Sequence, residues 1–308
     1  IITGRKFLKE KGYIDKLTGL LKKTDIKFTL YENVTPEPTT EDANICVKFC
    51  KKVSPDLIVG IGGGSVLDLA KSVAVLVAND GHPGDFLELD GIKPITNFGL
   101  PFIAVPTTAG TGSEVTNNAV LKNPQTGVKR SIRNDKLFAK VAICDPVLTQ
   151  FMPKELTFIS GMDAISHAIE AYLSVKSSPL TDVITRESLE LFAKSFKKVL
   201  TDGKDINARS EILLASTLAG VAFVNAGLGL LHGISGPLGG VFNIPHGLTN
   251  ALLLAGYVDY HRDNPRMREI IQIFGKEDFY NDYFELAGIY YGLSLIHISE
   301  PTRLGMIS

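Results

Sequence analysis

The sequence lacks long apolar runs, a strong excess of either charge, and abundant cysteine. No stretch reaches the roughly 18 consecutive apolar residues that a membrane helix needs, and the opening IITGRKFLKEKGY lacks the charged-then-apolar pattern of a secretory signal. We therefore expect a cytoplasmic protein without a membrane partner. Because 32 basic residues nearly balance 33 acidic ones and form no basic stripe, nucleic acid is not expected as a partner either.

The chain has only 3 cysteines. Cys46 and Cys50 have the spacing of one helix face, and Cys144 stands alone. This spacing fits neither a zinc-binding pair nor a redox motif. We therefore expect ordinary buried or half-buried thiols.

Over residues 1–150, short β-branched runs alternate with helical patterns. Such alternation is typical of a parallel sheet covered on both faces, so we predict a Rossmann-like α/β domain. The expected elements are strands within 27–32, 56–65, 101–108 and 140–146, and helices over 40–53 and from Ser65.

From Pro153 to about Pro265 the chain is a series of apolar helical repeats broken by glycine and proline, with almost no alternating strand pattern. This pattern predicts an all-α domain over 151–292. The boundary between the two domains is expected within 146–153.

Both ends look incomplete. The first residues, IITGRKF, begin as if inside a strand and without an initiator Met. The segment LSLIHISEPTR, residues 293–303, looks like the translation of a sequencing adapter. We therefore expect natural sequence to end near Gly292, and exclude 293–308, with His297, from functional reasoning.

The segment VGIGGGSVLDLAKS follows a predicted strand and opens a predicted helix. Backbone N–H groups of Gly62, Gly63, Gly64 and Ser65 could therefore point at an anion on the helix N-terminus. The spacing is neither G-x-G-x-x-G nor that of a P-loop. A tight turn in which Ser65 caps the helix and Asp68 completes a capping box is the competing interpretation.

A second polar segment, PTTAGTGSEVTNNAV, follows the predicted strand FIAV. It concentrates the hydroxyls of Thr107, Thr108, Thr111, Ser113 and Thr116. Loops that follow parallel strands meet at one sheet edge, where open sheets bind ligands. Two such loops together favour a nucleotide-binding edge over a pair of ordinary turns.

Asp163 and His167 lie four residues apart in a predicted helix, hence on one face. Taken alone, this pair favours a helix cap formed by Asp163 with Ser160, together with a buried histidine, over a metal site. The glycine-rich GLGLLHGISGPLGGVFNIPHG adds His232 and His246. One carboxylate and three imidazoles suit Fe(II) or Zn(II).

The remaining histidines are less promising. His82 lies in a Gly/Pro loop, and His261 lies in the polar turn DYHRDNP. We expect neither to bind metal.

These segments resemble the iron-containing (group III) alcohol dehydrogenases, within the dehydroquinate synthase-like superfamily. The matching motifs occur in the order PEPT, GIGGGSVLDLAK, PTTAGTGSE, GMDAISHAIEAY and HGISGPLGGVFNIPHG. The resemblance implies an N-terminal nucleotide-binding α/β domain, a C-terminal helical domain and a metal site between them. By motif position the metal ligands would be Asp163, His167, His232 and His246. The nucleotide would lie along Gly63, Gly64, Ser65, Thr107, Thr108, Thr111, Thr116 and Asn118, with Lys129 close by.

Three positions depart from the family pattern. Gly236 stands where many members carry a further histidine beside the metal, which leaves no evident protein base. Gly4 and Arg5 follow the first strand where NAD-preferring members carry an acidic residue. Because Arg5 can pair with a 2′-phosphate, we predict a preference for NADP(H) over NAD(H). Glu37 replaces the usual Asn of the first motif.

The resemblance implies reversible hydride transfer between a primary alcohol or aldehyde and the nicotinamide, in a homo-oligomer, expected to be a dimer. A hydroxyacid–oxoacid transhydrogenase is the nearest alternative. A dehydroquinate synthase-like lyase would need several Lys or Arg at the metal cleft, and the segments around His232 and His246 contain none. A third alternative is a fragment that binds nucleotide without catalysis.

Overall fold

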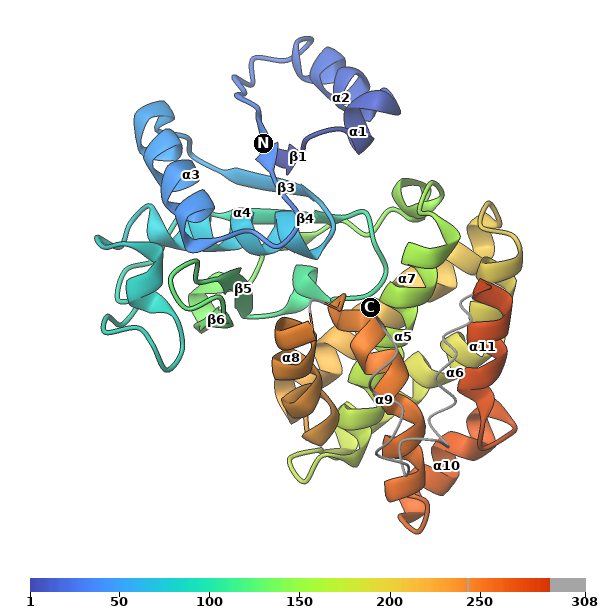
Figure 1. Cartoon of the computed structure of the whole chain (residues 1–308). Helices are drawn as coiled ribbons and strands as arrows, with labels where there is room; N and C mark the ends of the chain where they lie inside the picture. The colour runs from blue at the N-terminus through green and yellow to red at the C-terminus, as the bar shows by residue number, and fades with distance from the viewer. Residues whose placement is uncertain (243, 289–308) are drawn as a thin grey trace.

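The computed structural model describes residues 1–242 and 244–288, and its first part is built on a five-stranded parallel sheet (Figure 1). The strands are β1 (Ile2–Gly4), β2 (Tyr31–Val34), β3 (Ile58–Gly62), β4 (Phe102–Pro106) and β7 (Val141–Ala142). Their order is β2-β1-β3-β4-β7, so the chain reverses its direction of travel between β1 and β3. Open parallel sheets bind ligands beyond the carboxyl ends of the strands at such a reversal.

Helices cover both faces of this sheet, as the alternating pattern predicts. They are α1 (Phe7–Glu10), α2 (Tyr13–Leu21), α3 (Thr40–Val53) and α4 (Gly64–Leu76). Apolar residues of α3 and α4 pack with Ile58 and Ala104 on one face. Leu8 of α1 and Ile14 of α2 pack with Ile61 on the other. The helix predicted over 40–53 is confirmed, with Thr39 and Asp42 forming a capping box at its start.

Two predicted strands are shorter than the sequence suggests. The strand expected over 27–32 is β2, which begins only at Tyr31. Its ladder with β1 begins where Ile2 lies opposite Tyr31. The strand expected within 140–146 contains only Val141 and Ala142, at the sheet edge beside β4.

An antiparallel pair of strands was not predicted. It consists of β5 (Asn118–Lys122) and β6 (Lys129–Arg133), and the 3-10 helix η2 (Ser113–Val115) precedes it. Its polar and charged residues hide the strand pattern, because only Ala119, Leu121 and Ile132 turn into the core. This ribbon packs against α4 and is joined to the start of α3 by a bridge between Thr39 and Lys122.

From Lys154 on, the described residues form helices and no strand, as predicted. These are α5 (Lys154–Leu173), α6 (Pro179–Thr201), α7 (Ile206–Ala226), α8 (Leu230–Phe242), α9 (His246–Tyr260), α10 (Pro265–Phe274) and α11 (Phe279–Ala287). Helix α5 lies at the centre of this part, and every residue over 161–172 is buried. A helix that is apolar and buried on all sides forms the core of a large helical layer.

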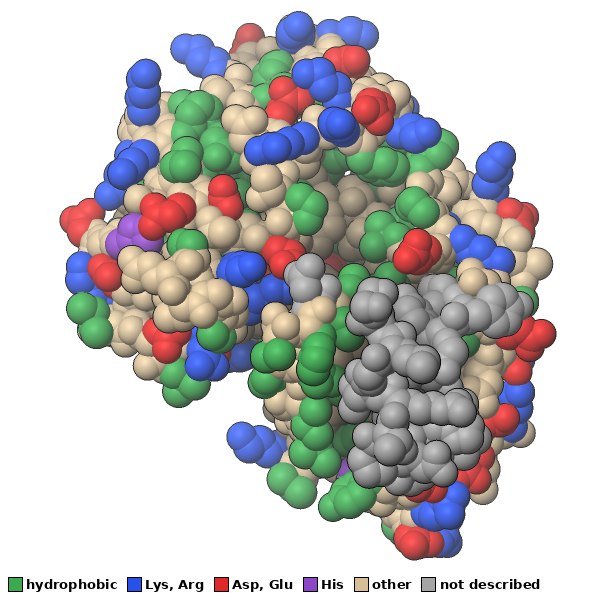
Figure 2. Space-filling model, viewed as in Figure 1, with side chains coloured by type: hydrophobic (Ala, Val, Ile, Leu, Met, Phe, Trp, Pro, Cys, Tyr) green, Lys and Arg blue, Asp and Glu red, His purple; other side chains and the backbone are tan. Residues whose placement is uncertain are grey.

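Exposed side chains differ between the two parts (Figure 2). Lys and Arg gather over α1 and α2, whereas a stripe of apolar side chains lies over α8. The exposed apolar residues at α8 are Leu228, Leu230, Ile234, Val241 and Phe242. Within 1–242 and 244–288, no single helix is long and apolar enough to cross a membrane; α7 and α8 meet that criterion only as a pair, bent by 106°.

Candidate active site

Helix α5 presents two of the predicted metal ligands from its interior. Asp163 and His167 lie well inside Lys154–Leu173, and both are buried. The N-cap of α5 is Pro153, so the competing interpretation of Asp163 and Ser160 as a helix cap is wrong. The i, i+4 spacing brings His167 Nε2 to 4.0 Å from Asp163 Oδ1.

The other two histidines reach the same carboxylate oxygen from two further helices. His232 Nε2 of α8 and His246 Nε2 of α9 each lie 3.6 Å from Asp163 Oδ1. Ligand atoms of Asp163, His167 and His232 all lie within 4.8 Å of one another. Neighbouring ligands of a tetrahedral ion with bonds of about 2.1 Å are about 3.4 Å apart, so this spacing fits a shared divalent cation.

The electrostatics also fit a cation. Although burial favours the neutral acid, the neighbouring imidazoles hold the pKa of Asp163 well below its ordinary value. Burial lowers the pKa of His167 to about 4, which keeps this imidazole neutral. Burial also disfavours charge on His232, but its carboxylate partners raise its pKa to about 9. The cluster therefore combines a carboxylate with imidazole groups and favours positive charge at its centre.

Two buried polar groups have unsatisfied atoms here. Asn250 Nδ2 donates to Asp163 Oδ1 at 2.6 Å and lies 3.0 Å from His232 Nε2 and 3.3 Å from His246 Nε2. An amide nitrogen has only two hydrogens for these three acceptors. Asn250 Oδ1 and His167 Nδ1 are both buried without a hydrogen-bond partner among the described residues. Buried polar atoms left without partners are rare, and their presence here fits a place built for an ion.

The sequence analysis did not identify Asn250 or Glu170, which lies beside His232. Asn250 lies four residues after His246 in α9, and Glu170 three residues after His167 in α5. Both are fully buried, at 0% and 1% exposure. The helical spacings HxxxN and HxxE could have indicated both residues.

On the nucleotide side, the two polar loops contact each other. Thr107 N donates to Gly62 O, at the carboxyl ends of the paired strands β3 and β4. A Cβ on Gly64 would lie 2.7 Å from Thr111 Cγ2, so the loops approach too closely for any larger residue at that position. These contacts bring Gly63, Gly64, Ser65, Thr107, Thr108 and Thr111 together at the sheet edge.

The predicted cap at Ser65 is wrong. The N-cap of α4 is Gly63, in extended conformation and without a side-chain cap, so Ser65 lies in the first turn. Its hydroxyl instead accepts a hydrogen bond from Glu37 N at 3.2 Å. Without a capping side chain, the first N–H groups of α4 remain available to an anion.

Asp68 does not form the predicted capping box either. It accepts hydrogen bonds from Ser113 Oγ at 2.5 Å and Val120 N at 2.9 Å, and so joins α4 to the second loop and the ribbon. One turn on, the fully buried Lys71 donates to Thr116 O, Thr116 Oγ1 and Asn118 O at 2.8–3.1 Å. The hydroxyl of Thr116 and the backbone of Asn118 thus have partners within the protein.

The second loop also meets the helical part. Gly112 has a φ of +62°, and a Cβ there would lie 2.7 Å from the Cα of Gly220 in α7. A Cβ on Gly110 would lie 2.7 Å from Ser160 of α5. The nucleotide loops therefore adjoin the helix that carries Asp163 and His167.

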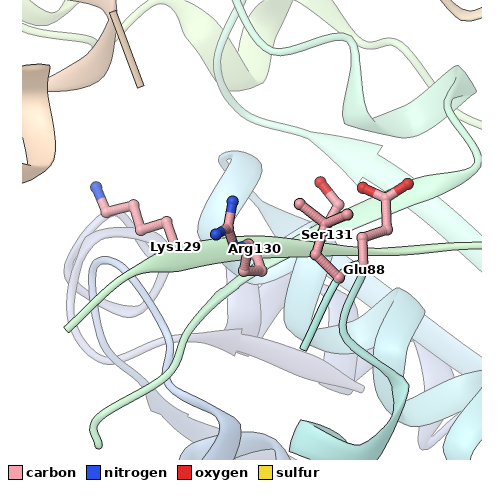
Figure 3. A pocket seen from close by; sticks show the side chains of 5 residues that line it. Glu88, Lys129, Arg130 and Ser131 are labelled. Carbon is pink, nitrogen blue, oxygen red and sulfur yellow. The ribbon is translucent and has the colours of Figure 1, made fainter. Parts of the chain in front are cut away.

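Lys129 lies on the ribbon and pairs with Glu37, whose backbone has a φ of +55°. Both charges act on the pKa of His246, so the pair lies on the side of the cluster where His246 stands. Lys129 also lines a cavity of about 530 Å³ (Figure 3), which none of the four predicted metal ligands lines. The other lining residues are Glu88, Leu89, Arg130 and Ser131.

The remaining predicted positions are more exposed. Gly4 ends β1, and the exposed Arg5 follows it beside the carboxyl end of β3. Arg5 takes part in none of the ion pairs found among residues 1–242 and 244–288. Gly236 lies in α8, and a Cβ there would meet nothing within 4 Å. Space for a larger side chain exists at that position.

The residues set aside in the sequence analysis have structural partners. His82 Nδ1 accepts a hydrogen bond from Gly84 N, and His261 packs against Tyr257 and Tyr260. Cys46 and Cys50 are buried, but Cys144 is exposed, contrary to the prediction of a buried or half-buried thiol. It lies on the short connection after β7, where its Sγ is 3.7 Å from Thr217 Oγ1 of α7. His297 and the segment 293–308 lie outside the described residues.

A parallel sheet with a glycine-rich turn at its point of reversal, joined to a helical part with a buried carboxylate–imidazole cluster, defines the dehydroquinate synthase-like class of fold. The family model for iron-containing alcohol dehydrogenase matches residues 1–146, and that for the C-terminal part of the Fe-containing alcohol dehydrogenase family matches residues 157–287. The chain therefore belongs to the iron-containing alcohol dehydrogenase family of oxidoreductases. This confirms the resemblance and the fold expected from the sequence.

Comparisons with individual proteins agree with the match to the family models. The chain is 42% identical over 266 residues to long-chain-alcohol dehydrogenase 1 of Geobacillus thermodenitrificans, covering 86% of this chain and 67% of the relative. An iron-containing alcohol dehydrogenase structure from Thermotoga maritima superposes with a TM-score of 0.82 at 32% identity, covering 94% of this chain and 79% of the other. Sulfoacetaldehyde reductase of Bifidobacterium kashiwanohense, solved with NAD⁺, superposes with a TM-score of 0.87 at 30% identity, covering 97% of this chain and 81% of the other. The chain spans 60–69% of the first curated relatives' length.

Proposed function

We propose that this protein interconverts a small primary alcohol and its aldehyde with a nicotinamide nucleotide, at a divalent metal held by Asp163, His167, His232 and His246. The observation that carries the proposal is the approach of three imidazole Nε2 atoms to 3.6–4.0 Å from Asp163 Oδ1. Family membership supports the reaction class.

The donor set suits Fe(II) or Zn(II), and we propose Fe(II). When bound, the metal would supply a Lewis acid to the substrate oxygen, and the nicotinamide would exchange the hydride. The protein supplies orientation and exclusion of water. Asp163 and His167 are closed off by the core, whereas the His246 side chain is 44% exposed. We propose that substrate enters on the His246 side.

The nucleotide is proposed to lie along the two contacting loops. Gly63 and Gly64 present backbone N–H groups to its phosphates, and the hydroxyls of the second loop hold the part nearest α5. The residues proposed are Gly4, Arg5, Gly63, Gly64, Ser65, Thr107, Thr108, Thr111, Thr116, Asn118 and Lys129. Because Arg5 is exposed and lies at the β1–β3 reversal, we propose NADP(H) as the preferred form.

No imidazole stands at Gly236, where many family members carry one. Both Gly236 and His246 are exposed. We propose that the alcohol proton passes to solvent along this open side, by way of water or the ribose hydroxyls.

Further predictions remain proposals. We propose two domains, residues 1–150 and 151–292, since the last strand ends at Ala142 and the long helices begin at Lys154. The homo-oligomeric state, expected to be a dimer, and the cytoplasmic location stay predictions.

The test is anaerobic reduction of a panel of small aldehydes by the full chain supplied with Fe(II), following NADPH and NADH separately. His246→Ala is the test variant and His261→Ala the matched control, because the His261 ring packs against Tyr257 and Tyr260 and takes part in none of the ion pairs of the described residues. We expect aldehyde-dependent oxidation of NADPH that His246→Ala abolishes and His261→Ala preserves.

Absence of turnover with either nucleotide, at full metal occupancy, would overturn the dehydrogenase proposal. A nucleotide that stays bound and never exchanges would instead indicate the transhydrogenase. Equal rates with NADH and NADPH would overturn only the proposed cofactor preference.

A further inference from the structure

Glu170 is a buried carboxylate that hydride transfer by itself does not require. It lies in α5, one turn beyond His167, and is 1% exposed. Among the ion pairs of the described residues, it pairs with no Lys or Arg; its partner is the His232 ring. A buried carboxylate is costly unless several donors satisfy its oxygens.

The two oxygens of Glu170 have separate partners at the start of α8. Oε1 accepts a hydrogen bond from Leu231 N at 2.7 Å. Oε2 lies 2.5 Å from His232 Nδ1 and accepts a weaker bond from His232 N at 3.3 Å. The carboxylate therefore contacts both the first turn of α8 and the ring that this turn carries.

A glycine just before α8 leaves room for this carboxylate. A Cβ on Gly229, just before α8, would lie 3.0 Å from Glu170 Oε1. The free N–H groups at a helix start favour a negative charge there. Glu170 therefore holds α8 in place relative to α5, which carries Asp163.

We infer that Glu170 is a positioning residue that keeps hydrogen on Nδ1 of His232, so that Nε2, which faces Asp163, is the nitrogen left to bind a metal. This inference rests on the proposed function, because it assumes that Nε2 of His232 binds the metal. A carboxylate has no hydrogen to donate, so Nδ1 must be the donor of the 2.5 Å contact. Carboxylates bound to the remote nitrogen of a metal-binding histidine orient the ring and increase its basicity.

The acceptor character of Glu170 can be removed while its size is kept. In Glu170→Gln one oxygen can still accept from Leu231 N, but the amide NH₂ then faces His232 Nδ1. A donor at that position favours hydrogen on Nε2, which blocks the nitrogen that faces Asp163. The opposite amide orientation would set NH₂ against the N–H of Leu231. Both orientations disturb the cluster, whereas Glu170→Asp keeps an acceptor.

The experiment measures Zn(II) affinity by competition with a chelator and the His232 tautomer by ¹⁵N NMR of the Zn(II)-bound protein. Glu155→Gln is the matched control, because Glu155 is exposed in the first turn of the same helix. We expect about 10–100-fold weaker binding in Glu170→Gln, partial recovery in Glu170→Asp, and no change in the control. The wild-type spectrum should show hydrogen on Nδ1 and metal at Nε2.

The wild-type spectrum tests the inference even if Glu170→Gln does not fold. Hydrogen on Nε2, with metal at Nδ1, would overturn it. Unchanged affinity and tautomer in a folded Glu170→Gln would also overturn it, since a purely structural role lowers the melting temperature without changing the tautomer. If the wild-type protein binds no divalent metal, the proposed function is wrong, and this inference falls with it. If the wild-type protein binds metal, and His246→Ala weakens binding while Glu170→Gln does not, only this inference is wrong.

Discussion

The two halves of the proposed site differ in the parts of the chain that form them. The metal half consists of buried side chains from α5, α8 and α9, around the single carboxylate oxygen of Asp163. The nucleotide half consists of two loops whose glycines and threonines touch at the sheet edge, with Gly63, Gly64 and Ser65 only half-buried. Selectivity for a metal therefore depends on side-chain identity, whereas room for a nucleotide depends on backbone shape.

The largest effect is expected in the metal half. Asp163→Asn removes the charge that the three imidazoles share, and should weaken metal binding at least about 100-fold, more than loss of an outer partner does. The measurement is bound metal per chain after dialysis against a weak chelator. Asp259→Asn, at an exposed position of α9, is the control. Full metal retention in Asp163→Asn would contradict the site.

In the nucleotide half, the fully buried Lys71 holds the second loop through hydrogen bonds from its ammonium group. Lys71→Met leaves acceptors of Thr116 and Asn118 without their donor, which costs about 1–3 kcal/mol for each buried unsatisfied group. We expect lower stability toward urea at pH 7, while Lys51→Met, in an exposed ion pair with Asp80, should change little.

The pH dependence of the same variant gives a second measurement. Burial lowers the pKa of Lys71 to about 8, whereas the unfolded chain keeps a pKa of about 10.4. Between these values the unfolded chain binds more protons, so the stability of the native protein rises with pH. The gap between wild type and Lys71→Met should widen by about 2 kcal/mol from pH 8 to pH 10. A gap that stays constant over this range would show that this ammonium keeps its ordinary pKa.

The contact between the two loops should respond to a single methyl group. In Gly64→Ala the new Cβ lies 2.7 Å from Thr111 Cγ2, so we expect a loss of about 1–3 kcal/mol in stability and weaker NADPH binding. Gly19→Ala is the control, because Gly19 lies inside α2 with nothing within 4 Å of its Cβ. That change should be neutral or stabilising by up to about 1 kcal/mol. Unchanged nucleotide affinity in Gly64→Ala would show that the first loop does not contribute to nucleotide binding.

The smallest effect is expected at Glu37. Its φ of +55° is one that Asn adopts more readily than Glu, which accounts for the usual residue of the family motif. Glu37→Asn relieves this strain and frees Lys129 from its partner. We expect NADPH to bind a few-fold more tightly and with a steeper dependence on salt, measured by fluorescence titration. Glu88→Gln, which breaks the nearby pair with Arg133, is the control. Weaker binding in Glu37→Asn would show that Glu37 itself assists the nucleotide.

Much of the site follows from the sequence because it is encoded locally. The i, i+4 spacing of Asp163 and His167 predicts one helical face, and the glycine-rich turn after a strand predicts an anion site. The glycine-rich segment that contains both singled out His232 and His246, and the family resemblance assigned them to the same ion as Asp163 and His167, since no spacing shows that three helices converge. Glu170 and Asn250 were missed, although the spacings HxxE and HxxxN place each of them on the helical face of a predicted ligand.

The errors of the sequence-based prediction at Ser65 and Asp68 can each be traced to particular contacts. Ser65 has a good capping side chain, but the chain makes its turn at Gly63, so the hydroxyl faces Glu37 instead. Asp68 has the right spacing for a capping box, yet Ser113 of the second loop and Val120 of the ribbon each donate to one of its oxygens. Because residues distant in the sequence supply these partners, spacing along α4 could not reveal them. The ribbon was missed because most of its side chains are polar.

The complete burial of α5 over 161–172 has a consequence for the order of events in a catalytic cycle. Segments at the centre of a core open only when the whole protein unfolds, whereas loops with half-exposed backbone open locally and often. Amide hydrogens of α5 should therefore exchange with deuterium last, and those around Gly63 and Thr111 much earlier. A group held by α5 would stay for the lifetime of the folded molecule, while one held by the two loops could leave and be replaced at every turnover.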